Sequence, residues 1–481
     1  MPEARIRAPE LPDTLEWINT EPVRLSDLRG KIVLLNFWTS GCVNCMHMQE
    51  DLRDLLNTYR DNLVVIGIHT PKFPHDNNRG TVHKSVNRQH IKHPVAHDPI
   101  SRVWKKYAIK AWPSIVFIDA EGYVVGSLRG EGRRRQIDDL IQKYIGIAQQ
   151  KKILNLDQVS VYATPEPAGV LNFPGRVLAT GTHLYISDSG HNRIIQANHH
   201  GRVTQIFGSG TAGLLDGVGA YAAFDNPQGL AMENDFLFVA DMGNHAIRSI
   251  NTQNAEIITL AGNGEMQYTA ERVFADPLQT RLNSPRDLCY NHGVLFISMT
   301  GQHQIWRMEL TANELSVFTG SGKENLIDGK PGEASLAQPS GMAMGEYCIY
   351  ITDAETSSIR LVRLPDGQIS TLIGAGRLEH GDINGGWAHA RLQHPLDIVF
   401  DQQPGLIYIA DTYNNKVKVM DLQSKGIRSI ETGKGLDEPG GISLYNNQLW
   451  IANTNAHEIR KVNLTTNTVE VIELNEPEFD F

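Results

Sequence analysis

The sequence predicts a multidomain protein, with an α/β sandwich over residues 1–150, a linker over 151–169 and an all-β six-bladed propeller over 170–481. Three observations lead to this division. At 481 residues, the chain is longer than one ordinary domain. Its first part alternates strand-like apolar runs with helix-like patterns, and its second part repeats short strands and glycine turns six times.

The first domain is expected to alternate strands and helices around a mostly parallel sheet. Unbroken apolar runs such as KIVLLNFW are typical of strands that are buried on both faces. Apolar residues at three- and four-residue spacing predict helices. The expected elements are a strand at 31–38, a helix at 45–59, a strand at 63–70, a polar loop or insertion at 71–87, two strands within 114–128 joined by a turn at Ala120–Gly122, and an amphipathic helix at 133–148.

The second part of the chain contains a six-fold repeat. The aligned segments are LYISD (184–188), LFVAD (237–241), LFISM (295–299), IYITD (349–353), IYIAD (407–411) and LWIAN (449–453). They recur at intervals of 42 to 58 residues, and a β-branched residue follows ten positions after each start. A proline precedes five of the starts by ten positions, and Pro395 precedes the other by twelve. Each copy holds four strand candidates, so six copies predict a closed ring of four-stranded blades.

The repeat resembles the NHL family, whose blades carry a strand ending in Y-V-A-D followed by a polar turn. The motif is clearest in YISDSGHNRI (185–194) and YIADTYNNKV (408–417). This resemblance implies an NHL-type propeller.

Cys42 and Cys45 carry the most specific chemical signal in the sequence. They form a Cys-x-x-Cys motif directly after a predicted strand, and Cys45 opens the following helix. The N–H groups and dipole of the helix N-terminus favour a thiolate at Cys42, which is therefore the predicted nucleophile. The spacing lets Cys45 act as the resolving thiol. Trp112 and Pro113 precede the next core strand, and with Trp38 they are predicted to frame a substrate groove, with Pro113 in the cis form.

This combination resembles the thioredoxin superfamily, in particular the branch with an added segment before the proline, here 75–95. Ordinary thioredoxins carry a buried acid where Asn36 stands and Gly-Pro where Val43 and Asn44 stand. Loss of the acid removes a proton acceptor for the resolving thiol. Read together, CVNCMH, GIHTPKF (67–73), HPV (93–95), WPS (112–114) and the NHL ring resemble bacterial relatives of NHL repeat-containing protein 2.

Several other polar residues are candidates for a functional role. His47, Asn36 and Asn44 are candidates for tuning the Cys42 thiolate. A histidine on a helix, however, is more often structural. The histidines at 69, 83, 90, 93 and 97 are interpreted as a solvated insertion, and Cys289 and Cys348 as small core residues. The repeated aspartates are expected to bond backbone N–H groups of the following turn and not to bind metal; they are Asp188, Asp241, Asp353 and Asp411. No metal and no cofactor are expected, because a second Cys-x-x-Cys for zinc and a Cys-x-x-Cys-His for haem are both missing from the sequence.

Charge and composition limit the partners. The first 150 residues carry a net charge of +4 and the remainder −14, which argues against nucleic-acid binding by the larger part. No run of 18 apolar residues and no signal-like N-terminus is found, so a cytoplasmic location away from membranes is expected. The leading hypothesis is a thiol–disulfide oxidoreductase whose propeller binds a protein partner or a protein disulfide substrate. The alternative is a non-enzymatic scaffold or redox sensor in which the thioredoxin-like domain binds partners.

Overall fold

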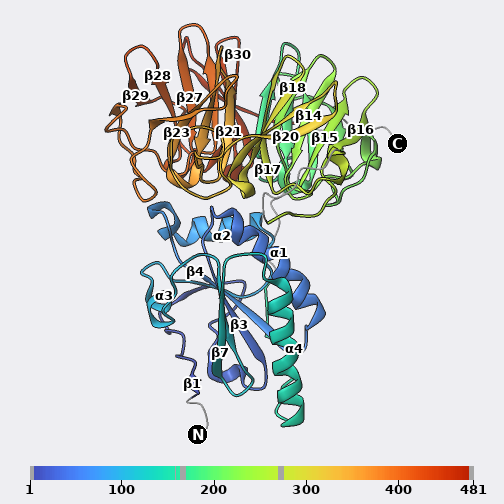
Figure 1. The fold of residues 1–481 in the computed structure, drawn as a ribbon, viewed down its shortest axis with the longest axis vertical. Coiled ribbons are helices and arrows are strands. Elements are labelled where there is room, and N and C mark those ends of the chain that lie inside the picture. The colour runs from blue at the N-terminus through green and yellow to red at the C-terminus, as the bar shows by residue number, and fades with distance from the viewer. Residues whose placement is uncertain (1–4, 158, 163–168, 269–275, 476–481) are drawn as a thin grey trace. The chain divides into compact units, whose positions relative to one another are not determined.

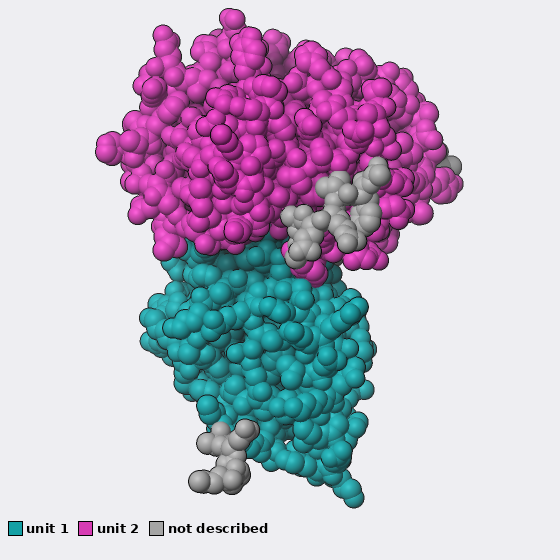
Figure 2. Space-filling model, in the orientation of Figure 1, with its two compact units in different colours: residues 1–166 teal, residues 167–481 magenta. Residues whose placement is uncertain are grey.

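The structure is a computed structural model that describes residues 5–157, 159–162, 169–268 and 276–475. It contains two compact units, Met1–Glu166 and Pro167–Phe481 (Figures 1 and 2). The linker expected at 151–169 falls partly outside the described residues. Among the residues that are described, no helix is both long enough and apolar enough to span a membrane.

The first unit is built on a seven-stranded sheet with the order β1-β7-β6-β3-β4-β5-β2. In that order, the strands are Ile6–Arg7, Tyr123–Arg129, Ser114–Ile118, Ile32–Trp38, Leu63–His69, Val95–His97 and Glu16–Ile18. The α-helices α1 to α4 are Val43–Thr58, Arg79–Arg88, Arg102–Lys106 and Arg134–Gln150, and two short 3-10 helices lie at Leu25–Leu28 and Pro74–Asn77. The strands and helices predicted from apolar periodicity are therefore confirmed to within a few residues.

The prediction of a mostly parallel sheet was wrong. Only the pairs β3–β4 and β4–β5 are parallel, and the other pairs are antiparallel. The physical reason is the turn between β6 and β7, which is too short for a crossover and therefore forms a hairpin. Within the described sheet, strands that are joined through a helix and pair in parallel are limited to β3, β4 and β5.

Apolar side chains cover both faces of this sheet. On β3, Val33, Leu35 and Phe37 belong to one buried cluster, while Ile32 and Leu34 belong to the other. The second cluster is completed by α1 and α4, whose buried residues repeat at three- and four-residue spacing, as in Met48, Leu52 and Leu55 of α1 and Ile137, Ile141 and Ile145 of α4. This packing fixes α1, and with it the cysteine motif, against the sheet.

The polar stretch 71–87 was predicted as a loop or an insertion, and the loop alternative is wrong. It contains α2, whose N-cap Asn78 accepts hydrogen bonds from the backbone N–H groups of Gly80 and Thr81. Val82 and Val86 lie one turn apart on α2 and are fully buried. Two apolar residues in a polar segment suffice to anchor the helix, because they pack into the cluster beneath the cysteines.

The described residues of the second unit form six sheets, one for each sequence repeat. Their strands are β8–β11 (Arg176–Ala179, Leu184–Asp188, Arg193–Ala197, Val203–Phe207), β13–β16 (Pro227–Glu233, Phe236–Asp241, Ala246–Asn251, Glu256–Ala261), β17–β20 (Pro285–Asn291, Val294–Met299, Gln304–Glu309, Glu314–Thr319), β21–β24 (Pro339–Met344, Cys348–Asp353, Ser358–Arg363, Ile369–Ile373), β26–β29 (Asp397–Asp401, Leu406–Asp411, Lys416–Asp421, Gly426–Ser429) and β30–β33 (Pro439–Tyr445, Gln448–Asn453, Glu458–Asn463, Val469–Ile472). Short strands β12 (Gly217–Val218) and β25 (Gly385–Gly386) extend the second and fifth sheets. The first strands of successive sheets contact one another in a closed ring, which confirms the six-bladed propeller.

The first and last blades are joined by hydrogen bonds at three levels. The Thr454 hydroxyl donates to the carbonyl of Pro174 at 2.8 Å, and the Ala179 N–H donates to the Ser443 hydroxyl at 3.0 Å. Further out, the N–H of Val203 donates to the carbonyl oxygen of Asn475 at 3.1 Å. These bonds close the ring without an exchanged strand in the described blades, since each blade is made of consecutive segments.

The repeated aspartates have a structural role, as predicted, but they bond a different segment. Each carboxylate accepts a backbone N–H from the loop that precedes its own blade's first strand. The pairs are Asp188 with Asn172, Asp241 with Asp225, Asp353 with Ala337 and Asp411 with Gln393. In blades 2, 4 and 5 a buried cation also pairs with this carboxylate, as Arg248 does with Asp241 at 2.9 Å.

The axis of the propeller alternates charged residues with glycines. In blades 1, 3 and 5, the second residue after the repeat proline is Arg176, Asp287 or Asp397. In blades 2, 4 and 6 it is a glycine, at positions Gly229, Gly341 and Gly441. A Cβ added to these glycines would stand 2.4–2.8 Å from the Cα of the charged residue in the next blade, so glycine is required by space. The Arg176 guanidinium lies 3.7 Å from the carboxylate of Asp287 and 3.6 Å from that of Asp397.

Candidate functional site

Cys42 and Cys45 lie where β3 leads into α1. Cys42 is the N-cap residue, and its carbonyl accepts the N–H groups of Cys45 and Met46 at 3.0 and 3.2 Å. Both cysteines are free thiols. Cys45 is completely buried and Cys42 is 6% exposed, so of the two residues only Cys42 reaches the surface. The strand-to-helix placement predicted from the sequence is confirmed.

The electrostatic environment of Cys42 differs from the expected one. Its thiol is hydrogen-bonded to Cys45, and this contact, followed by burial, raises the pKa of Cys42 well above its usual value. The positive charge of Lys72 acts in the opposite direction. The helix N-terminus was expected to lower this pKa, so burial and the second sulfur outweigh it here. Lys72 is a site residue that the sequence analysis missed, although it lies in the GIHTPKF segment.

The aromatic residues of the predicted groove have different roles. Trp38 is fully buried and packs in one cluster with both cysteines, so it forms the floor of the site. Trp112 is half-buried, borders the same cluster and packs against Trp104 with ring centroids 4.4 Å apart. The Trp112–Pro113 peptide bond is cis, as predicted.

Asn36 and Asn44 both carry buried polar atoms. Asn36 is fully buried on β3, and neither its amide nitrogen nor its amide oxygen has a hydrogen-bond partner among the described residues. It alternates with Leu35 and Phe37, so it lies on the sheet face that α1 covers. Within the same described part of the chain, the side-chain oxygen of Asn44 also lacks a partner. An amide therefore stands where the thioredoxin resemblance places an acid.

The structure directs His47 toward a residue other than the cysteines. Its ring Nδ1 is paired with Glu131 in the segment before α4. Burial lowers the pKa of His47, but the hydrogen bond to Glu131 and the nearby carboxylates outweigh it, so the pKa is raised. The charges that shift the pKa of Cys42 come from Cys45 and Lys72. Tuning of Cys42 by His47 stays a prediction.

A chain of buried side chains runs from the cysteine loop across the neighbouring strands. The Ser40 hydroxyl lies 3.1 Å from His69 Nε2, His69 Nδ1 lies 3.2 Å from His97 Nδ1, and His97 Nε2 lies 3.2 Å from the Asn77 carbonyl. Burial lowers the pKa of His69 and of His97, so both rings are neutral near pH 7. Because the carbonyl only accepts, the chain donates in one direction, from Ser40 through His69 and His97 to Asn77.

These positions correct the expectation of a solvated histidine stretch. His69, His93 and His97 are buried, because they lie on or beside β4 and β5 in the middle of the sheet. His90 is exposed. No group of three or more potential ligands placed to hold a metal ion occurs in the described ranges of the chain. Cys289 is buried on β17 and Cys348 is half-buried on β22, far apart in sequence from the motif.

The fold and site together define a thioredoxin-like domain joined to a six-bladed NHL-type propeller. A family model described as the AhpC/TSA family matches residues 7–127. NHL repeat-containing protein 2 of Bos taurus is 34% identical over 522 residues, which cover 98% of this chain and 72% of that protein. The chain belongs to the family of NHL repeat-containing protein 2.

Two further relatives match different shares of the chain. Protein SUPPRESSOR OF QUENCHING 1, chloroplastic, of Arabidopsis thaliana is 36% identical over 501 residues, covering 95% of this chain and 46% of that protein. The thiol-disulfide oxidoreductase ResA of Bacillus cereus is 29% identical over 121 residues, covering 25% of this chain and 68% of ResA. The first unit therefore has homologues among thiol–disulfide oxidoreductases.

Proposed function

We propose that the protein is a thiol–disulfide oxidoreductase in which Cys42 and Cys45 cycle between dithiol and disulfide. The observation that carries this proposal is the direct contact between the two thiols at the N-terminus of α1. The cis Pro113 before β6 and the likeness of this unit to ResA support the same chemistry.

The reaction begins when the Cys42 thiol gives up its proton, which the positive charge of Lys72 favours, and the thiolate attacks one sulfur of a substrate disulfide. A mixed disulfide forms, and the substrate's other sulfur leaves as a thiolate that takes up a proton. The Cys45 thiolate then attacks the Cys42 sulfur, which releases the second substrate thiol. The substrate gains two electrons, the Cys42–Cys45 pair becomes a disulfide, and an external dithiol reductant restores it.

In this proposal the propeller binds the protein partner or the protein that carries the substrate disulfide, in the cytoplasm. Loops on a rigid scaffold are suited to binding. The propeller strands bury their apolar side chains within and between the blades, which leaves the polar connecting loops for recognition.

The first test is a redox titration of the Cys42–Cys45 pair in glutathione buffers, read by mass-shift alkylation. A reversible two-electron transition between roughly −300 and −150 mV supports the proposal. Cys42→Ser is expected to abolish reduction of insulin disulfides, and Cys45→Ser to accumulate mixed disulfides. A pair that forms no disulfide anywhere in this range rules the enzyme function out.

The second candidate function is a non-enzymatic scaffold or redox sensor. It is favoured by the near-complete burial of Cys42 and by the amide of Asn36 at the position where thioredoxins hold an acid. Under this alternative, capture of protein partners by the full chain persists in both cysteine variants. Loss of the captured partners in Cys42→Ser alone would instead favour the enzyme.

A further inference from the structure

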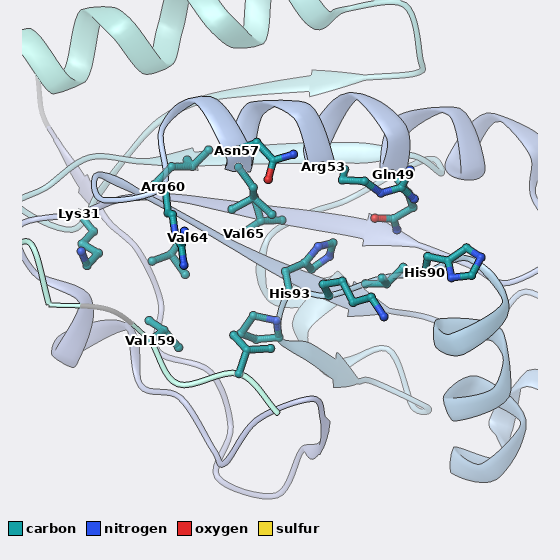
Figure 3. A pocket seen from close by; sticks show the side chains of 16 residues that line it. Lys31, Gln49, Arg53, Asn57, Arg60, Val64, Val65, His90, His93 and Val159 are labelled. Atoms are coloured by element: carbon teal, nitrogen blue, oxygen red, sulfur yellow. The ribbon is translucent and has the colours of Figure 1, made fainter. Parts of the chain in front are cut away.

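A groove of about 560 Å³ lies along α1 in the first unit, and neither Cys42 nor Cys45 lines it. Its walls come from α1, the start of β4, the segment 90–94 before β5, and Val159 with Val161 (Figure 3). Its volume falls within the range of about 300–1,000 Å³ that is usual for small-molecule sites. The mechanism proposed above makes no use of it.

The mouth of this groove is basic. Arg53, Arg60 and Lys92 line it with exposed side chains, and no lining residue is acidic. Within the described ranges, none of these three side chains forms an ion pair, and Arg53 donates only to the carbonyl of Gln89 at 3.3 Å. Lys31 differs, because its ammonium group donates to the carbonyls of Asp61 and Asn155 at 2.9 Å each. The three exposed cations are therefore available to an anion.

The inner end of the groove holds buried polar groups that lack partners. Gln49 is 4% exposed, and both polar atoms of its amide have no hydrogen-bond partner in the described chain; the same holds for Nε2 of His93, which is 6% exposed. Burial, followed by the charge of Arg53, lowers the pKa of His93 to about 3, so its ring is neutral. In Figure 3, Lys31 lies at one end of the groove and Gln49 at the other. Unpaired buried polar groups are costly, so these two point to a hydrogen-bonding occupant.

Apolar side chains line the groove beside these polar and basic groups. Leu56, Val65 and Ile91 line the groove on α1, on β4 and before β5. Gln49 and Arg53 are one helical turn apart on α1, so the polar and basic parts follow one another along one helix face. The groove thus offers hydrogen-bonding, apolar and cationic groups within one site.

We infer that this groove binds a nucleoside phosphate. The edge of a nucleobase carries both donors and acceptors, which match the amide of Gln49 and the neutral ring of His93. Its faces pack against the apolar walls, and the phosphate pairs with Arg53, Arg60 and Lys92. Gln49 lies one turn beyond Cys45 on α1, and neither cysteine lines the groove, so a base bound there leaves the cysteine motif uncovered.

The test measures binding of the four nucleoside monophosphates to the full chain by calorimetry and by the shift in thermal midpoint. At least one is expected to bind with a dissociation constant below about 1 mM, and to bind at least tenfold tighter than its nucleoside or inorganic phosphate. The affinity should fall as salt rises, because the mouth is open to solvent. Failure of all four to bind at this concentration, or equal binding of inorganic phosphate, would overturn the inference.

Two variants assign the binding to this groove. Arg53→Glu with Arg60→Glu reverses the charge of the mouth and should abolish binding, whereas Arg135→Glu, an exposed arginine on α4, should leave it unchanged. Gln49→Met keeps the volume and removes the unpaired amide, so binding should weaken while the unliganded thermal midpoint stays level or rises. Unchanged affinity in the double variant or in Gln49→Met would contradict the assignment.

Discussion

Replacing Arg176 with methionine tests how the axis of the propeller is held together. Arg176 is 3% exposed, its guanidinium donates to the carbonyls of Gly440 and Leu396, and it lies within 3.7 Å of two buried carboxylates. At these distances each ion pair is worth about 4–5 kcal/mol at an effective dielectric constant of about 20. Much of that offsets the desolvation of the three charges. We expect a net loss of about 3–5 kcal/mol in the free energy of unfolding of the propeller.

The loss should depend on pH. Burial raises the pKa of Asp397 to about 7 and also raises that of Asp287, despite the opposing charge of Arg176. Between about pH 4 and 7, the folded propeller therefore holds protons that the unfolded chain has released, and its stability falls as the pH rises. Without Arg176 both pKa values rise further, so the window extends upward. Arg176→Met should cost most near pH 9 and least near pH 5, where Asp397 is protonated.

The assay is denaturation of the full chain in urea at pH 5, 7 and 9, followed by hydrogen exchange of peptides from β8, β17 and β26. Peptide resolution is needed because the chain has two units that need not unfold together. The triple variant Arg176→Met, Asp287→Asn, Asp397→Asn should recover most of the loss at pH 9, since the asparagine oxygens still accept the N–H groups of the next blades. Arg428→Met serves as an exposed control. Equal destabilisation at pH 5 and 9, or a triple variant no more stable than the single one at pH 9, would refute the reasoning.

Three further predictions concern buried polar groups and close backbone contacts. Asn36→Leu should raise the free energy of unfolding of the first unit by about 1–3 kcal/mol, because the buried amide of Asn36 has no partner in the described chain. If urea denaturation shows that the variant is less stable than the parent chain, the amide has a hydrogen-bond partner and the prediction is wrong. Gly341→Ala should lower the free energy of unfolding by about 1–3 kcal/mol, because the added Cβ would meet the backbone of the next blade at 2.5 Å. Gly146→Ala, in an uncrowded part of α4, should raise it by about 0.5–1 kcal/mol. A higher thermal midpoint for Gly341→Ala, or a lower one for Gly146→Ala, would contradict these expectations. Burial lowers the pKa of His93 to about 3, so the unfolded chain binds a proton below about pH 6.5 that the folded chain excludes, and stability should fall with falling pH by up to about 1.4 kcal/mol per unit. His93→Leu should flatten this acid slope in a pH series of unfolding curves, and exposed His90→Gln should leave it unchanged.

Periodicity in the sequence predicts the elements whose apolar residues repeat strongly. The run of β3, the spacing along α1 and the six aligned strand segments all report local burial, which a sequence pattern records directly. Burial that depends on tertiary contacts is not recorded in such a pattern. In α2 only Val82 and Val86 are apolar and buried within a polar segment, and their meaning depends on the cluster beneath the cysteines.

For the candidate site, the sequence predicts the positions of the cysteines but not their electrostatic environment. The placement of Cys42 and Cys45 follows from the strand-to-helix junction, which is encoded locally. The raised pKa of Cys42 follows only in part. Its largest cause is the neighbouring Cys45 thiol, but the second is burial, which depends on residues from α2 and β5 that are distant in sequence. The burial of His97 was missed for the same reason, since its partly polar neighbourhood in the sequence carries no sign that its strand lies inside the sheet. His69 ends the apolar run of β4, so the sequence did hold a signal for its burial.

Because charged residues and glycines alternate around the propeller axis, the ring closes correctly only with an even number of blades. Each glycine makes room for the charged residue of the following blade, so two successive blades form the smallest unit that can be added or removed without a clash. Excision of one blade would bring two glycines or two bulky residues together at the axis. Excision of two successive blades would keep the alternation of glycine and charged residue at the axis. Shortened or enlarged rings built from this chain should therefore close with four or eight blades more readily than with five or seven.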